Sequence, residues 1–103
     1  MLVYIRPFEK MANTVSLAVG TSTGSVAVTG AGVGTGTVRL VNSGTNTIFV
    51  EFGTSGVTAT TTTSIPLLPN SVETFVFRKE NTHVAAIADT AGNTLYVTYG
   101  VGS

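Results

Sequence analysis

A Ser-His-Asp triad in this chain would have to use His83 and Asp89, because the sequence contains one histidine and one aspartate. Such a triad also needs a serine presented on a sharp turn, and no serine here lies in a nucleophile-elbow sequence. With no cysteine present, the same two residues do not make a recognisable metal-ligand cluster. We therefore interpret His83 as the beginning of a strand, with its ring hydrogen-bonded at a rim or an interface, and predict no catalytic residue and no metal site.

Two carboxylates, Glu51 and Glu73, could lie on neighbouring strands, as a two-carboxylate glycosidase would require. Each is flanked by apolar residues of the opposite parity, which is typical of a charge that faces solvent or pairs across strands. The stretch GAGVGTG lacks the glycine spacing of a dinucleotide-binding loop, and no predicted helix follows it to hold a phosphate. We therefore predict that the protein is not an enzyme and that it binds no cofactor.

The elements that position these side chains are predicted to be strands. Apolar residues alternate with Thr, Ser and other small polar residues, which is the two-residue period of a half-buried strand. No segment shows the period of a helix. The predicted strands cover residues 13–19, 25–29, 37–42, 46–52, 71–77, 82–88 and 93–99.

Turn residues between these strands predict how the strands are connected. Gly44 and Gly92 lie in short polar stretches between alternating runs, so each is expected to close a hairpin. Pro66 and Pro69 remove two backbone donors and indicate an edge or a corner. Seven or eight short strands at this spacing are typical of an all-β fold, an antiparallel sandwich of jelly-roll type, over residues 14–103.

Three phenylalanines predict that the sheets carry apolar groups on both faces. Phe49, Phe75 and Phe77 alternate with the aliphatic residues of their own strands, so that Val72 and Val76 are expected to face the core. Since only one face of each sheet meets the core of a two-layer sandwich, we expect the phenylalanines to lie on a second face. Another subunit or the first ten residues would cover that face. The alternative is a bulge that turns these rings inward.

The first thirteen residues are expected to form an extended arm. Pro7 prevents regular ladder pairing at its position, and ten extended residues can reach roughly 33 Å. Ordering such a segment costs about 1–2 kcal/mol per residue in backbone entropy, so its apolar side chains need a surface. We expect the arm to dock on an adjacent subunit, with docking on its own domain as the weaker alternative. The residues expected to make this contact are Leu2, Tyr4, Ile5 and Phe8.

Composition favours association with other proteins. The formal net charge is zero and 10% of the residues are charged, against about 25% in a typical soluble domain. Nucleic acid is therefore not an expected partner, while low repulsion between copies favours a homo-oligomer. The apolar runs are too short to cross a bilayer, and no signal peptide is recognisable. We accordingly expect neither a membrane partner nor export of the chain.

Three stretches resemble the small all-β virion proteins of tailed bacteriophages, and most of all the capsid decoration, or cement, proteins. They are VRLVNSGTNTIFVEFGTSG, IPLLPNSVETFVF and THVAAIADTAGNTLYVTYGVG, within residues 38–102. The resemblance implies a β-sandwich that oligomerises on the outer surface of a phage capsid and stabilises contacts between major capsid proteins. It also implies assembly in the host cytoplasm and supplies no shared active residues.

An alternative hypothesis is that the chain is part of a tail fibre or adhesin that binds glycans on the host surface. Exposure of Tyr96 or Tyr99 in a concave site would favour that function.

Overall fold

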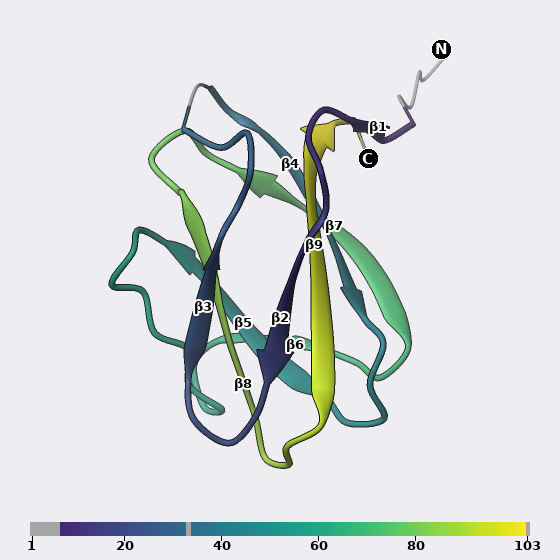
Figure 1. Ribbon diagram of the computed structural model, residues 1–103, viewed down its shortest axis with the longest axis vertical. Helices are drawn as coiled ribbons and strands as arrows, with labels where there is room; N and C mark the ends of the chain where they lie inside the picture. Colours follow the sequence, from purple (N-terminus) through teal and green to yellow (C-terminus); the bar gives the residue numbers. More distant parts are fainter. Residues whose placement is uncertain (1–6, 33, 103) are drawn as a thin grey trace, which may run out of the picture.

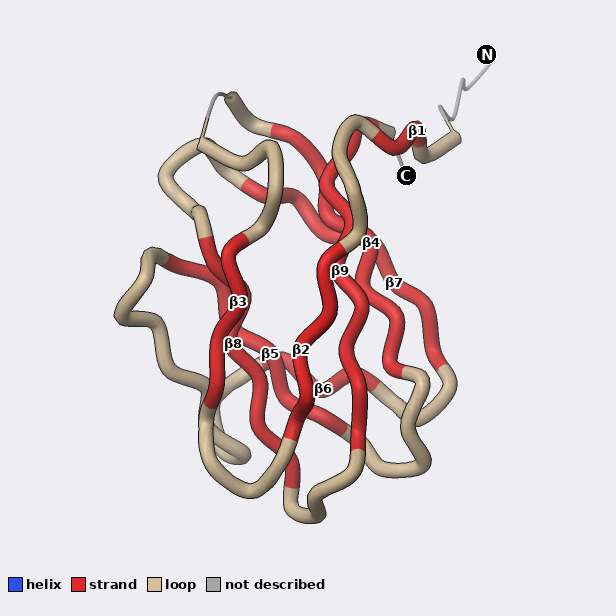
Figure 2. Tube along the Cα trace, viewed as in Figure 1, coloured by secondary structure: helices blue, strands red, loops and turns tan. Residues whose placement is uncertain are grey.

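The computed structural model describes residues 7–32 and 34–102 of the 103-residue chain (Figure 1). The described residues form strands joined by loops and include no helix, and so none that could cross a membrane (Figure 2). The strands are β1 (Glu9–Lys10), β2 (Val15–Val19), β3 (Gly24–Ala27), β4 (Gly36–Asn42), β5 (Ile48–Gly53), β6 (Ile65–Leu67), β7 (Ser71–Phe77), β8 (His83–Ala88) and β9 (Asn93–Val101).

Two antiparallel sheets form a jelly-roll sandwich. Sheet A has the order β1-β9-β4-β7, with β2 also paired to β9, and sheet B has the order β3-β8-β5-β6. From β2 onward, every connection except the one between β5 and β6 passes from one sheet to the other. The prediction of an all-β antiparallel sandwich is confirmed, because the alternating apolar residues supply one buried face for each sheet.

The two predicted hairpins are wrong, since the turns at Gly44 and Gly92 join strands of different sheets. β4 and β9 belong to sheet A, whereas β5 and β8 belong to sheet B. A short turn with glycine between two alternating runs can join strands of one sheet or strands of two sheets. The turn sequence alone therefore does not distinguish a hairpin from a connection between sheets. A Cβ at Gly44 would collide with the amide of Asn93, which explains the glycine at that corner.

β7 shows the opposite orientation to the one expected. Phe77 and Phe75 pair with Gly36 and Val38 of β4, and Val38 is fully buried, so both rings face the core. The Phe77 side chain is 0% exposed, while Val72 and Val76 are 49% and 60% exposed. The placement of Phe75 and Phe77 on a second face is therefore wrong. The pairing with β4 is regular from Ser71 to Phe77, so no bulge is needed to turn the rings inward.

Aromatic rings fill one part of the core. Phe52 meets Phe75 and Phe77 edge to face, with ring centroids 5.7 and 5.5 Å apart, and Phe77 meets Tyr99 at 6.3 Å. Such pairs stabilise by about 0.5–1.5 kcal/mol beyond the area that they bury. The remaining buried core is largely aliphatic and comes from both sheets, for example from β4 and β5. This cluster fixes which side of each strand faces outward.

Candidate interaction surface

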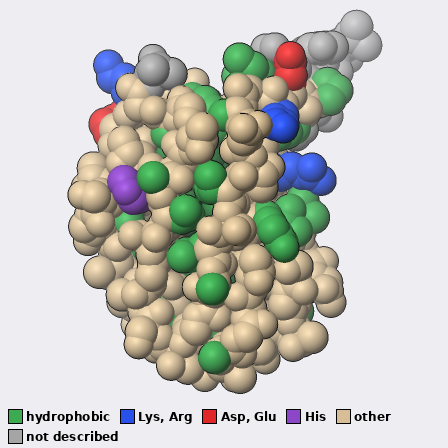
Figure 3. All heavy atoms as spheres, in the orientation of Figure 1, with side chains coloured by type: hydrophobic (Ala, Val, Ile, Leu, Met, Phe, Trp, Pro, Cys, Tyr) green, Lys and Arg blue, Asp and Glu red, His purple; other side chains and the backbone are tan. Residues whose placement is uncertain are grey.

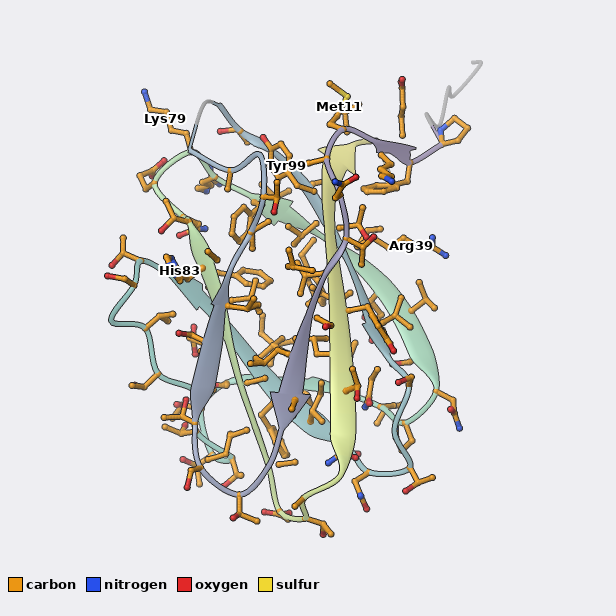
Figure 4. All side chains as sticks on the ribbon, viewed as in Figure 1. Met11, Arg39, Lys79, His83 and Tyr99 are labelled. Carbon is orange, nitrogen blue, oxygen red and sulfur yellow. The ribbon has the colours of Figure 1, made fainter. Side chains whose placement is uncertain are left out.

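The described part of the N-terminal arm docks on its own domain. β1 pairs with the end of β9, and the backbone N–H of Met11 donates to the carbonyl oxygen of Tyr99 at 3.0 Å. The Phe8 ring packs against Gly100, where an added Cβ would lie 2.7 Å from the ring. Figure 4 shows Met11 and Tyr99 close together at this end of the sandwich. Phe8 therefore contacts β9 of its own chain, which agrees with the weaker alternative that the arm docks on its own domain.

Leu2, Tyr4 and Ile5 lie outside the described residues, and their docking on an adjacent subunit stays a prediction. The described chain begins at Pro7, two residues before β1.

Gly100 provides a test of how the arm is held. We expect Gly100→Ala to break the β1 pairing, because its Cβ would overlap the backbone carbonyl of Glu9 as well as the Phe8 ring. Amide exchange should then become faster at Met11, whose N–H bonds to β9. Gly34→Ala is the matched control, since its Cβ would meet no atom within 4 Å. Unchanged protection at Met11 in Gly100→Ala would contradict the described docking.

Part of the outer face of sheet B is covered by the chain itself. Residues 54–64, which include the threonine run, connect β5 to β6. Within this segment the Ala59 N–H donates to Oγ1 of Thr23, and Oγ of Ser64 donates to Oε1 of Glu51, both at 2.8 Å. Ala85 pairs with Glu51 on this outer face and is 0% exposed. The loop therefore covers part of a face for which a subunit or the first ten residues was expected.

Phe49 lies on that outer face, on the side of β5 away from the core, as its parity predicted. It is half-buried and lies opposite Pro66 and Ile87 on the adjoining strands. Its role in an interface between subunits stays a prediction.

Sheet A carries a more open apolar face. Tyr96, Val41 and Val72 lie opposite one another on β9, β4 and β7, and Val76 lies further along β7. Tyr96 is 41% exposed, and the two valines of β7 are exposed to a similar or greater extent. We call these four residues, Val41, Val72, Val76 and Tyr96, the β7 surface.

Arg39 is the cation beside the β7 surface. It lies on β4 in register with Thr74 of β7, on the same face of the sheet as Val41. In Figure 4 its side chain points away from the sandwich, and Figure 3 shows hydrophobic and basic side chains next to one another on the surface of the molecule. An apolar row flanked by a guanidinium group suits contact with another protein, where aromatic residues and arginine are enriched.

β7 also leaves one of its sides unpaired among the described strands. It is seven residues long, contains no proline, and carries Glu73 as its one charge. The edge strands of sheet B are shorter, with four residues in β3 and three in β6, which contains Pro66. A long edge without proline offers free backbone N–H and C=O groups to another strand. β7 therefore combines an apolar face with an available edge.

The residues first considered for catalysis do not come together. His83 begins β8 and Asp89 follows its last residue, which places the two residues about 20 Å apart along the chain. His83 begins that strand, and its Nδ1 lies 2.8 Å from Oγ1 of Thr82. Glu51 lies in sheet B and Glu73 in sheet A. Residues 7–32 and 34–102 form no pocket and no group of three possible metal ligands.

Sequence reasoning missed Val72 and Val76 as surface residues because alternation alone does not say which side of a strand faces inward. The larger side chains of Phe75 and Phe77 were the available signal, since a core gains more from burying a phenylalanine than a valine.

No protein-family model and no curated protein matches the chain. Among solved structures, the fold is similar to that of a protein from Bacillus endospore appendages, which are described as a family of disulfide-linked pili. The TM-score is 0.51 and the identity 15%, over 98% of this chain and 96% of that chain. The similarity therefore concerns the fold over nearly the whole length of both chains. The present chain has no cysteine, so it cannot form the disulfides of those pili.

Proposed function

We propose that the protein is a non-enzymatic structural subunit of a repeating protein assembly. The observation that carries this proposal is the β7 surface, an exposed apolar face that adjoins an unpaired strand edge. Surfaces of this kind on a soluble domain are typical of protein interaction sites. The low fraction of charged residues supports association, because copies repel one another weakly.

The outer surface of a phage capsid is the setting that we propose for this assembly. The support is the resemblance of residues 38–102 to capsid decoration proteins. In that setting the protein would bind major capsid proteins and its own copies, so that many modest contacts repeated by symmetry stiffen the shell. The endospore pilus protein offers independent support for assembly, since a jelly roll of this size serves there in a polymer.

The glycan-binding alternative has weaker support. Tyr96 is exposed but lies in register with Val41 and Val72 on an open strand face. Tyr99 is 7% exposed, and its hydroxyl donates to the carbonyl oxygen of Gly34 at 3.1 Å. Neither tyrosine is presented in the concave site that sugar stacking would use.

Sedimentation of the purified full chain over a range of concentrations tests the proposal. We expect oligomers that grow with concentration, and we expect Val76→Asp with Tyr96→Asp to shift the chain towards monomer. Charges at these positions cost desolvation when a partner covers them. Thr21→Asp, at an exposed turn outside the β7 surface, is the control and should sediment as the parent does. A parent chain that stays monomeric at every concentration would contradict the proposal.

Electron microscopy tests whether the protein binds the outer surface of a phage capsid. Added to phage capsids that lack it, the protein labelled at its carboxyl terminus should give regular label over the shell. Label at the tail alone would favour the glycan-binding alternative.

A further inference from the structure

We propose that the free edge of β7 accepts residues 1–6 of a second copy as an additional strand of sheet A. This inference rests on the proposed function, because it names the contact through which copies would assemble. The donor segment lies outside the described residues, which begin at Pro7.

The acceptor is the unpaired side of β7. A strand of six residues added there gains main-chain hydrogen bonds along most of β7, and alternate side chains supply specificity. Val72 and Val76, which are 49% and 60% exposed, would be covered on the outer face. Burial of these apolar side chains is favourable in itself, so an added strand gains from side chains as well as backbone.

The donor is indicated by its position. The described chain begins at Pro7, next to β1, and β1 lies at the edge of sheet A opposite β7 in the order β1-β9-β4-β7. Six extended residues span at most about 20 Å, which is enough for a strand that leaves one domain and pairs with its neighbour. Pro7 lacks a backbone N–H and so separates this segment from the β1 pairing.

Residue types in the donor agree with this role. Residues 2–5 read LVYI, a run of apolar, β-branched and aromatic residues of the kind enriched in strands. Arg6 is the one charged residue of the segment, and Glu73 is the one charged residue of β7. The two charges are of opposite sign, as a cross-strand pair requires.

An antiparallel register satisfies both the charge pair and the apolar residues. When Arg6 lies opposite Glu73, Tyr4 lies opposite Phe75, which is half-buried at the margin of the core. Val3 then lies opposite Val76 on the outer face, because side chains of paired residues share a face. Pro7 falls at Val72, near the end of β7, where its missing donor costs least.

The positions of the donor segment and of β7 predict the form of the assembly. Donor and acceptor lie at opposite edges of one sheet, so each copy would bind one neighbour with its arm and another with β7. Such a heterologous contact closes into a ring or continues as a filament. A contact between two β7 edges would instead stop at a dimer.

Disulfide trapping tests the register, and the absence of cysteine gives a clean background. We expect the double variant Val3→Cys with Val76→Cys, once oxidised, to form a ladder of covalent multimers on a non-reducing gel. Mass spectrometry should find the two introduced cysteines joined between chains. Val3→Cys with Thr98→Cys is the control, since Thr98 lies on β9, inside the sheet, and should give no ladder.

Four outcomes would overturn the inference. A covalent dimer from Val76→Cys alone, as efficient as the ladder, would indicate pairing of two β7 edges. A disulfide between positions 3 and 76 within monomers would indicate that the arm folds back on its own sheet. Absence of the link in samples that sedimentation shows to be oligomeric would reject this contact while the proposed function stands, whereas monomers throughout would reject both.

A charge exchange gives an independent check on the same contact. Arg6→Glu is expected to weaken association up to about fivefold, the range of a cross-strand charge pair, and Arg6→Glu combined with Glu73→Arg should restore it. Equal weakening by the single and the double variant would contradict the pairing of these two residues.

Discussion

Replacing Phe77 by alanine is expected to lower the free energy of unfolding by about 3–5 kcal/mol. The ring is fully buried and meets both Phe52 and Tyr99 edge to face. Its removal leaves a cavity between the two sheets and takes away contacts to rings from each of them. Urea or guanidinium unfolding of the purified variant measures the change.

Val76→Ala is the matched control for Phe77→Ala, because Val76 is the preceding residue on β7 and is 60% exposed. Its cost to the stability of the single domain should be within about 0.5 kcal/mol, as for other exposed positions. Measurement at low protein concentration keeps association out of the comparison. If Val76→Ala were the more damaging of the two, the orientation of β7 would be the reverse of the one described.

Asn42→Ala is expected to lower the free energy of unfolding by about 2–4 kcal/mol, since buried polar groups lose their partners. Asn42 is 0% exposed. Its Nδ2 donates to the carbonyl oxygens of Asn46, Leu67 and Leu68 at 2.9–3.1 Å, and its Oδ1 accepts from the N–H of Gly44 at 3.0 Å. One side chain thus joins the end of β4 to the corner before β5 and to the end of β6.

Two further variants separate the parts of this network. Asn42→Asp keeps the acceptor for Gly44 but removes the donor, so it should be at least as damaging as Asn42→Ala. Ser43→Ala should be nearly neutral, because the Oγ of Ser43 makes one long, exposed hydrogen bond of 3.4 Å to the carbonyl oxygen of Thr94. A neutral Asn42→Asp would show that the Nδ2 contacts contribute nothing to stability.

Strands were predictable from the sequence, whereas their connections were not. Alternation such as that of Ile48, Val50 and Phe52 identifies an extended segment whatever its partner is. Gly44 and Gly92 mark turns correctly, but whether a turn closes a hairpin or a corner depends on which strands pair at a distance. The order of strands in the two sheets is set by such distant pairs, for example β2 with β9.

The candidate surface was only partly predictable for the same reason. Phe49 and Phe77 follow the same alternation within their strands, yet one lies on an outer face and the other in the core. Residues 54–64 cover part of the outer face of sheet B, and nothing in their threonine-rich sequence predicts this position. The position of this loop depends on hydrogen bonds from Ala59 to Thr23 and from Ser64 to Glu51. In each pair the two residues are distant in sequence.

The pairing of the earliest strands with the last one has a consequence for biosynthesis. β1 and β2 both pair with β9, which also separates them from β4, so the middle of sheet A is not continuous until residues 93–101 have been made. A nascent chain on the ribosome therefore exposes apolar strands until β9 has been made, and such unpaired strands are prone to aggregate. Truncation before residue 93 would remove the strand with which β1, β2 and β4 all pair.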